Sequence, residues 1–190
     1  MSRGELHVAV GPMFCGKTTE LLRRLSIMKA VRGPVLYINH SSDERFTKSA
    51  GDNVTTHNIA FGGKTGVDTI KVSKLDGLDV SSYDVVGVDE AQFFSDIQVV
   101  RRWKDDGKIV YVVGLDGDFK QEVFGYIYTL LPVSETFKKL RTARCKVCAL
   151  QGDFNSQASF TRCVDGAEIS GGIDVGGEEK YQAVCWRHTK

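Results

Sequence analysis

The sequence predicts an α/β domain in which helices cover both faces of a parallel sheet. Short apolar runs rich in β-branched residues alternate with longer segments that repeat apolar residues at helical spacing. Glycine-rich or acidic residues follow the apolar runs, as they do at the carboxyl ends of parallel strands, where ligands bind. With 190 residues, 42% of them hydrophobic, the chain is long enough to bury a core without disulfides.

A strand, a loop, a helix and a second strand open the chain. Residues 6–10 form a short apolar run, and residues 17–31 then repeat leucines and a methionine at helical spacing. Gly33 and Pro34 end this helix, and residues 35–38 form the next apolar run. This order is the beginning of a βαβ unit.

The middle of the chain adds two strands and a helix. Residues 41–66 are rich in Ser, Thr, Asp, Asn and Gly, which predicts an exposed excursion with at most a short strand near 55–61. Apolar runs at 83–88 and 109–115 predict further buried strands, and residues 97–104 between them have a helical pattern.

The character of the sequence changes near residue 143. Pro132 predicts the start of a helix that continues to Leu140, because proline is favoured in the first turn. The remainder contains Cys-x-x-Cys, a glycine-rich stretch and Cys-Trp-Arg-His, with little regular periodicity. We therefore predict a main domain at 1–143 and a small second domain at 144–190.

The sequence also indicates the compartment. The N-terminus lacks the apolar region of a signal peptide, and no run is long enough to span a bilayer, so we expect a cytoplasmic protein without a membrane partner. Five cysteines in a reducing compartment favour metal binding over a disulfide framework. A formal net charge of +1 argues against a large, uniformly basic surface for nucleic acid.

A phosphate-binding loop follows the first predicted strand. The pattern G-x-x-x-x-G-K-[ST] is complete, and its strand and helix supply the required context. Backbone N–H groups would surround phosphate oxygens, Lys17 would reach the β- and γ-phosphates, and Thr18 would offer a hydroxyl to magnesium. The predicted nucleotide-binding residues of the loop, which the resemblance described below assigns to ATP, are Gly11, Pro12, Met13, Phe14, Cys15, Gly16, Lys17 and Thr18.

An acidic pair follows the apolar run at 83–88. Asp89 stands where a nucleotide-binding loop needs a carboxylate to hold hydrated magnesium. Glu90 would orient or deprotonate the attacking nucleophile, or alternatively position a water molecule in an ATPase. The sequence thus predicts nucleotide-dependent phosphoryl transfer with Mg²⁺.

Two knuckle-like pairs near the C-terminus predict a zinc site. Cys145 and Cys148 form one pair, and Cys185 and His188 form the other. Four such ligands complete a closed tetrahedral site, so we assign Zn²⁺ a structural role. Free buried thiols and a redox Cys-x-x-Cys are the alternatives. The metal would fix both ends of residues 149–184, and that loop would either close over a substrate or act as a nucleic-acid-binding ribbon.

Several motifs together carry a family resemblance. The chain has Gly-Pro-Met-Phe-Cys-Gly-Lys-Thr at 11–18, Asp-Glu-Ala-Gln-Phe-Phe at 89–94 and Leu-Asp-Gly-Asp-Phe at 115–119, followed by paired zinc knuckles. In this order it resembles the type II, cytosolic-type thymidine kinases. The resemblance implies a RecA-like fold and a zinc domain with a lasso-like lid loop. It also implies ATP-dependent phosphorylation of thymidine at the 5′-hydroxyl, for nucleotide salvage and DNA synthesis, in a homotetramer inhibited by thymidine triphosphate.

The resemblance also implies roles for individual residues. Glu90 matches the catalytic base, aided by Lys17 and Arg45, and Asp43 and Gln92 match further residues of the ATP site. The matching thymidine-binding residues are Met13, Phe93, Leu115, Phe119, Phe124, Thr161, Gly172, Ile173, Asp174, Val175, Gly176 and Tyr181. The alternative function is a P-loop ATPase whose zinc ribbon acts on nucleic acid.

Overall fold

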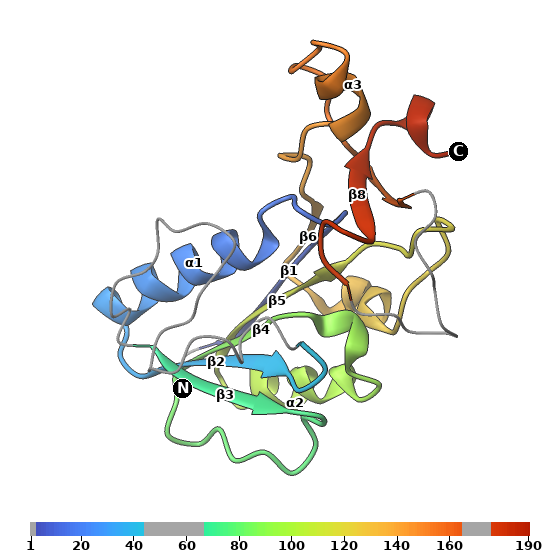
Figure 1. The fold of residues 1–190 in the computed structure, drawn as a ribbon. Helices are drawn as coiled ribbons and strands as arrows, with labels where there is room; N and C mark the ends of the chain where they lie inside the picture. The colour runs from blue at the N-terminus through green and yellow to red at the C-terminus, as the bar shows by residue number, and fades with distance from the viewer. Residues whose placement is uncertain (1–2, 44–66, 165–175) are drawn as a thin grey trace. The chain divides into compact units, whose positions relative to one another are not determined.

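The computed structural model describes residues 3–43, 67–164 and 176–190, and its main sheet has six strands in the order β3-β2-β4-β5-β1-β6 (Figure 1). The strands are β1 (Glu5–Gly11), β2 (Val35–His40), β3 (Asp68–Val72), β4 (Val85–Val88), β5 (Ile109–Leu115) and β6 (Thr136–Lys139). β2 pairs in parallel with both β3 and β4, and β4 pairs in parallel with β5. The predicted α/β class with a parallel sheet is confirmed.

β6 forms the edge of the sheet beside β1. The N–H of Glu135 donates to the carbonyl of Leu6, and the N–H of Leu140 donates to the carbonyl of Val10. Residue numbers therefore rise together along the two strands, which run in the same direction.

Helical segments cover both faces of the sheet. A Cβ at Gly87 in β4 would lie 2.6 Å from Leu25 Cδ1, so α1 packs closely on that face. Gly87 pairs with Tyr111 in β5, and Gly114, three residues on, faces the opposite side because strand side chains alternate. A Cβ at Gly114 would lie 3.0 Å from Ile127 Cδ1, which places η5 on that opposite face. The helices concerned are α1 (Lys17–Val31), η3 (Ala91–Phe93), η4 (Ile97–Val99), α2 (Val100–Asp105) and η5 (Ile127–Val133).

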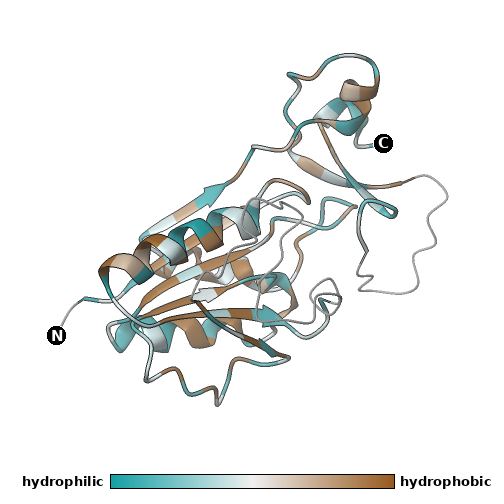
Figure 2. Ribbon diagram, turned by 60° about the vertical axis from the view of Figure 1, so that its left-hand side comes forward, coloured by the Kyte–Doolittle hydropathy of each residue, from teal (hydrophilic) through white to brown (hydrophobic). Residues whose placement is uncertain are grey.

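Burial explains why the central strands were readable in the sequence. Every residue of β2 and of β4 is buried, as expected for parallel strands covered on both faces. Figure 2 shows these strands as a brown layer beneath the mixed teal and brown surface of α1. The apolar runs predicted at 6–10, 35–38, 83–88 and 109–115 lie within or overlap β1, β2, β4 and β5, and the helix predicted at 17–31 is α1.

One predicted helix is wrong. Pro132 lies inside η5, which ends at Val133, and Thr136–Lys139 form β6 instead of continuing a helix. Pairing with β1 overrides the local preference, and the ring of Phe137 in β6 packs 5.7 Å from that of Tyr128. The short strand predicted near 55–61 lies outside the described residues.

The chain divides into two compact units. Unit 1 contains Met1–Ala9, Lys17–Gly114 and Gly125–Lys138, and unit 2 contains Val10–Gly16, Leu115–Phe124 and Lys139–Lys190. Unit 2 has α3 (Lys146–Leu150), the antiparallel pair β7 (Phe160–Cys163) and β8 (Tyr181–Val184), and η6 (Trp186–His188). The domain boundary between residues 143 and 144 stays a prediction. Among the described residues, no helix combines the length and apolar character needed to cross a membrane.

Candidate functional site

Residues 11–16 of the predicted phosphate loop form a tight turn in unit 2. A Cβ at Gly11 would lie 2.6 Å from Cys15 Sγ and 2.9 Å from the carbonyl oxygen of Leu140, so only glycine fits there. Phe14 and Gly16 both have positive φ, of 61° and 76°, and the hydroxyl of Thr142 donates to the carbonyl of Cys15. The loop joins the end of β1 to the start of α1, as a phosphate-binding loop requires.

In unit 1, Asp89 lies directly after β4 and is held by three donors. The hydroxyl of Tyr37 donates to Asp89 Oδ2 over 2.9 Å, the N–H of Glu90 donates to Asp89 Oδ1 over 2.8 Å, and the side chain of Thr18 also bonds to it. Burial raises the pKa of Asp89 to about 6, and the neighbouring Glu90 carboxylate adds to this rise. The structure thus brings together the hydroxyl and the carboxylate predicted to hold magnesium.

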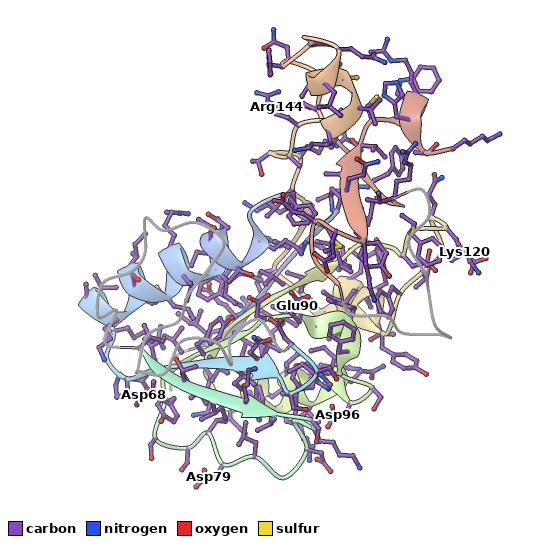
Figure 3. All side chains as sticks on the ribbon, in the orientation of Figure 1. Asp68, Asp79, Glu90, Asp96, Lys120 and Arg144 are labelled. Carbon is purple, nitrogen blue, oxygen red and sulfur yellow. The ribbon has the colours of Figure 1, made fainter. Side chains whose placement is uncertain are left out.

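Glu90, which is labelled in Figure 3, follows the end of β4. Its backbone conformation is unusual. Its φ of 50° and ψ of 42° lie in the left-handed region, which non-glycine residues adopt mainly where the surroundings enforce it. The N–H of Phe93 donates to its carbonyl over 3.0 Å, and Gln92 Nε2 donates to its Oε2 over 2.6 Å. Glu90 and Gln92 are both buried. Such strain is typical of functional positions.

Other predicted phosphate-site residues also lie in unit 1. Lys17 and Asp43 are buried, and Asn39 Nδ2 donates to Asp43 Oδ2 over 3.0 Å. Lys71 Nζ donates to the carbonyl of Asp43, so this residue is fixed through its side chain and its backbone. Arg45 lies outside the described residues.

The predicted thymidine-binding residues include two contacting pairs in unit 2. The N–H of Met13 donates to Thr161 Oγ1 over 3.0 Å, and the rings of Phe119 and Tyr181 lie 6.2 Å apart between centroids. Leu115, Phe124 and Gly176 belong to the same unit, whereas Phe93 belongs to unit 1, where its ring lies 5.5 Å from that of His40. Four other predicted thymidine-binding residues lie outside the described residues: Gly172, Ile173, Asp174 and Val175.

The four predicted zinc ligands converge in unit 2. The ligand atoms of Cys145, Cys148, Cys185 and His188 all lie within 4.8 Å of one another. His188 Nδ1 lies 3.4, 3.5 and 3.4 Å from the sulfur atoms of Cys145, Cys148 and Cys185, and the last two sulfurs lie 3.8 Å apart. A tetrahedron with Zn–S bonds of about 2.3 Å has S···S edges of about 3.8 Å, so this cluster has the size of a zinc site.

Supporting residues were missed in the sequence. Tyr37 and Asn39 are polar residues in the fully buried strand β2, and they bond to Asp89 and Asp43. A buried polar side chain normally needs a partner. Polar residues within an otherwise apolar run therefore indicate contacts to the site.

The sequence comparisons with known proteins agree on one family. The family model described as thymidine kinase matches residues 4–189. The thymidine kinase of fowlpox virus (strain NVSL) is 38% identical over 97% of this chain and 96% of its own, and thymidine kinase a of Arabidopsis thaliana is 39% identical over 97% and 74%. The thymidine kinase of variola virus is 36% identical over 97% and 96%. Among solved structures, the helicase nonstructural protein 10 of an arterivirus with DNA covers 77% of this chain and 39% of its own at 17% identity, with a TM-score of 0.43 that carries no functional argument.

Proposed function

The chain belongs to the thymidine kinase family, and from this we propose that it transfers the γ-phosphoryl group of ATP to the 5′-hydroxyl of thymidine. The chain is a kinase on the same ground. The products are thymidine monophosphate and ADP, and the reaction supplies a precursor for DNA synthesis by salvage. The observation that carries the proposal is the arrangement after β4, where Thr18 bonds to Asp89 and Gln92 bonds to Glu90.

The phosphate groups would be bound by the loop between β1 and α1. Its backbone N–H groups would surround the phosphates, and Lys17 would neutralise charge on the β- and γ-phosphates. Thr18 and Asp89 are oxygen donors in mutual contact, which suits Mg²⁺. When bound, magnesium would neutralise the charge of the β- and γ-phosphate oxygens. Asp43 and Arg45 complete the proposed set, and Arg45 would stabilise the charge on the transferring group.

Glu90 is the proposed general base. Its carboxylate would accept the proton of the 5′-hydroxyl as the oxygen forms a bond to the γ-phosphorus. The bond between that phosphorus and the β,γ-bridging oxygen breaks, and its electron pair leaves with ADP. The burial of Glu90 and the bond from Gln92 Nε2 to its Oε2 support this role, because a general base must be held within hydrogen-bond reach of the proton that it accepts.

The thymine base would be bound by aromatic, apolar and backbone groups. We propose contacts from the rings of Phe93, Phe119, Phe124 and Tyr181, the side chains of Met13, Leu115 and Thr161, and the backbone of residues 172–176. The contacts between Met13 and Thr161 and between Phe119 and Tyr181 support this assignment. The cluster of Cys145, Cys148, Cys185 and His188 supports the binding of a structural Zn²⁺. This ion would fix the ends of residues 149–184, which contain these backbone groups.

Family membership supports three further properties. We propose that the protein is cytoplasmic, that it is a homotetramer and that thymidine triphosphate inhibits it. Mass measurement in solution tests the homotetramer, and inhibition assays with thymidine triphosphate at varied ATP concentration test the inhibition.

Substitution of Glu90 tests the proposed chemistry. Glu90→Gln should lower turnover about 10²- to 10⁴-fold, because the base is removed while the phosphate loop is intact. ATP affinity, measured by calorimetry, should change little. Wild-type turnover in this variant would exclude Glu90 as the base, and ATP hydrolysis stimulated by single-stranded DNA rather than by thymidine would favour the ATPase alternative.

A further inference from the structure

Gln92 lies beside the proposed base in a position that fixes its carboxylate. Its Nε2 donates to Glu90 Oε2 over 2.6 Å, and both side chains are buried in unit 1. We propose that Gln92 is a positioning residue that sets the orientation of the Glu90 carboxylate for proton transfer. This inference rests on the proposed role of Glu90 and assigns Gln92 no contact of its own with the reacting atoms.

Gln92 is itself held in place by two glycines. A Cβ at Gly114 in β5 would lie 2.9 Å from Gln92 Oε1 and 3.2 Å from its backbone nitrogen. A Cβ at Gly125 would lie 2.2 Å from the carbonyl oxygen of Gln92, and Gly125 has a φ of 67°. Because the chain approaches Gln92 this closely on both sides, its backbone and its amide oxygen have little room to move. The amide nitrogen is then directed at Glu90.

The backbone of Glu90 is held separately from its side chain. Its N–H donates to Asp89 Oδ1 over 2.8 Å, and its carbonyl accepts from the N–H of Phe93 over 3.0 Å. These bonds fix the position of the Cα atom in the left-handed conformation. The carboxylate lies three rotatable bonds further along, so its plane depends on contacts of the side chain such as the bond from Gln92.

Orientation of the base matters because proton transfer requires hydrogen-bond reach. A displacement of about 1 Å in an active site can cost about 10²-fold in rate. Loss of the Gln92 amide should therefore lower kcat about 10- to 100-fold while leaving KM for ATP and for thymidine within about 3-fold, since binding does not depend on the base. If Gln92 instead bound ATP directly, as the family resemblance implies, its loss would raise the KM for ATP.

A double-mutant cycle tests the inference. Gln92→Met keeps the length of the side chain and removes the hydrogen-bond donor. Gln98→Met, which makes the same change at an exposed position of η4, is the control. We expect Gln92→Met to lower kcat in the wild-type background and to have no further effect in a Glu90→Gln background, because a positioning residue acts only through the base. Equal fold losses in both backgrounds, or a rise in KM without loss of kcat, would overturn the inference.

Comparison of the variants distinguishes a wrong assignment of the base from a wrong assignment of Gln92. Wild-type turnover of Glu90→Gln would remove the proposed base itself, whereas an impaired Glu90→Gln with an unimpaired Gln92→Met would overturn only the role of Gln92. Thermal unfolding of each variant reports on folding, and Gln92→Asn, which keeps the amide but shortens the side chain, provides a second substitution with the same expected kcat loss. If neither variant folds, Gln92 is a folding residue and the inference is overturned.

Discussion

Replacing Asp89 with Asn should stabilise the protein at neutral pH while impairing its activity. In the absence of magnesium and nucleotide, burial and the Glu90 carboxylate raise the pKa of Asp89 from 3.8 to about 6. Because the pKa of Asp89 is higher in the folded than in the unfolded protein, its contribution to the free energy of unfolding is complete below pH 3.8. That contribution is lost as the pH rises through 6. A rise of about two pKa units corresponds to a cost of about 3 kcal/mol at pH 8.

Asparagine would remove that cost but would weaken the bonds that Asp89 accepts. Tyr37 and the N–H of Glu90 both donate to the carboxylate, and poorer pairing with an amide costs about 1 kcal/mol. We therefore expect Asp89→Asn to raise the free energy of unfolding by about 1 to 3 kcal/mol at pH 8. At pH 4 the gain should disappear, because Asp89 is then protonated in the folded protein.

Urea unfolding followed by tryptophan fluorescence measures this difference in unit 1. Trp103 is buried in α2, and a Trp186→Phe background removes the signal of the exposed Trp186 in unit 2. Asp105→Asn, at an exposed position of α2, is the matched control and should change stability by less than about 0.5 kcal/mol. A loss of stability in Asp89→Asn at pH 8, or a gain that is equal at pH 4 and pH 8, would refute the reasoning.

Two further predictions concern the contacts that support each unit. Tyr37→Phe removes the buried hydroxyl that donates to Asp89 and should lower the free energy of unfolding by about 1.5 to 3 kcal/mol, so an unchanged urea midpoint would show that this bond contributes nothing. Removal of zinc by a strong chelator, or Cys185→Ser, should change the fluorescence of Trp186, which stands between Cys185 and His188 in the sequence. Either change should also weaken thymidine binding more than ATP binding. Purified protein that contains no zinc by elemental analysis would contradict this assignment.

The sequence predicted structure best where one local requirement, such as burial on both faces of a strand, determines the residue types. The runs that became β2, β4 and β5 are mainly apolar because both faces of each strand are buried, and a buried strand of this kind is recognisable without its neighbours. The loop between Gly11 and Thr18 and the Cys/His pairs were predicted from fixed residue types at fixed spacing, which phosphate and metal binding demand. The structure brings the four predicted metal ligands together in one cluster, Cys145, Cys148, Cys185 and His188.

Edge strands and supporting contacts were harder to predict for a physical reason. β6 has the sequence Thr-Phe-Lys-Lys and is mostly exposed, so its identity depends on pairing with β1 across more than a hundred residues of chain. β3 is mixed in polarity, and none of its residues is buried. The bond from Gln92 to Glu90 depends on the left-handed backbone at Glu90 and on the close approach of Gly125, neither of which has a local sequence signature.

The central claim is that this chain phosphorylates thymidine at the 5′-hydroxyl. Incubation of the protein with magnesium, γ-labelled ATP and each natural nucleoside in turn, followed by identification of the labelled product, tests it most directly. The account predicts that label appears in thymidine 5′-monophosphate, with much less transfer to cytosine and purine nucleosides. Label that appears only in inorganic phosphate, or equally in all the nucleosides, would contradict it.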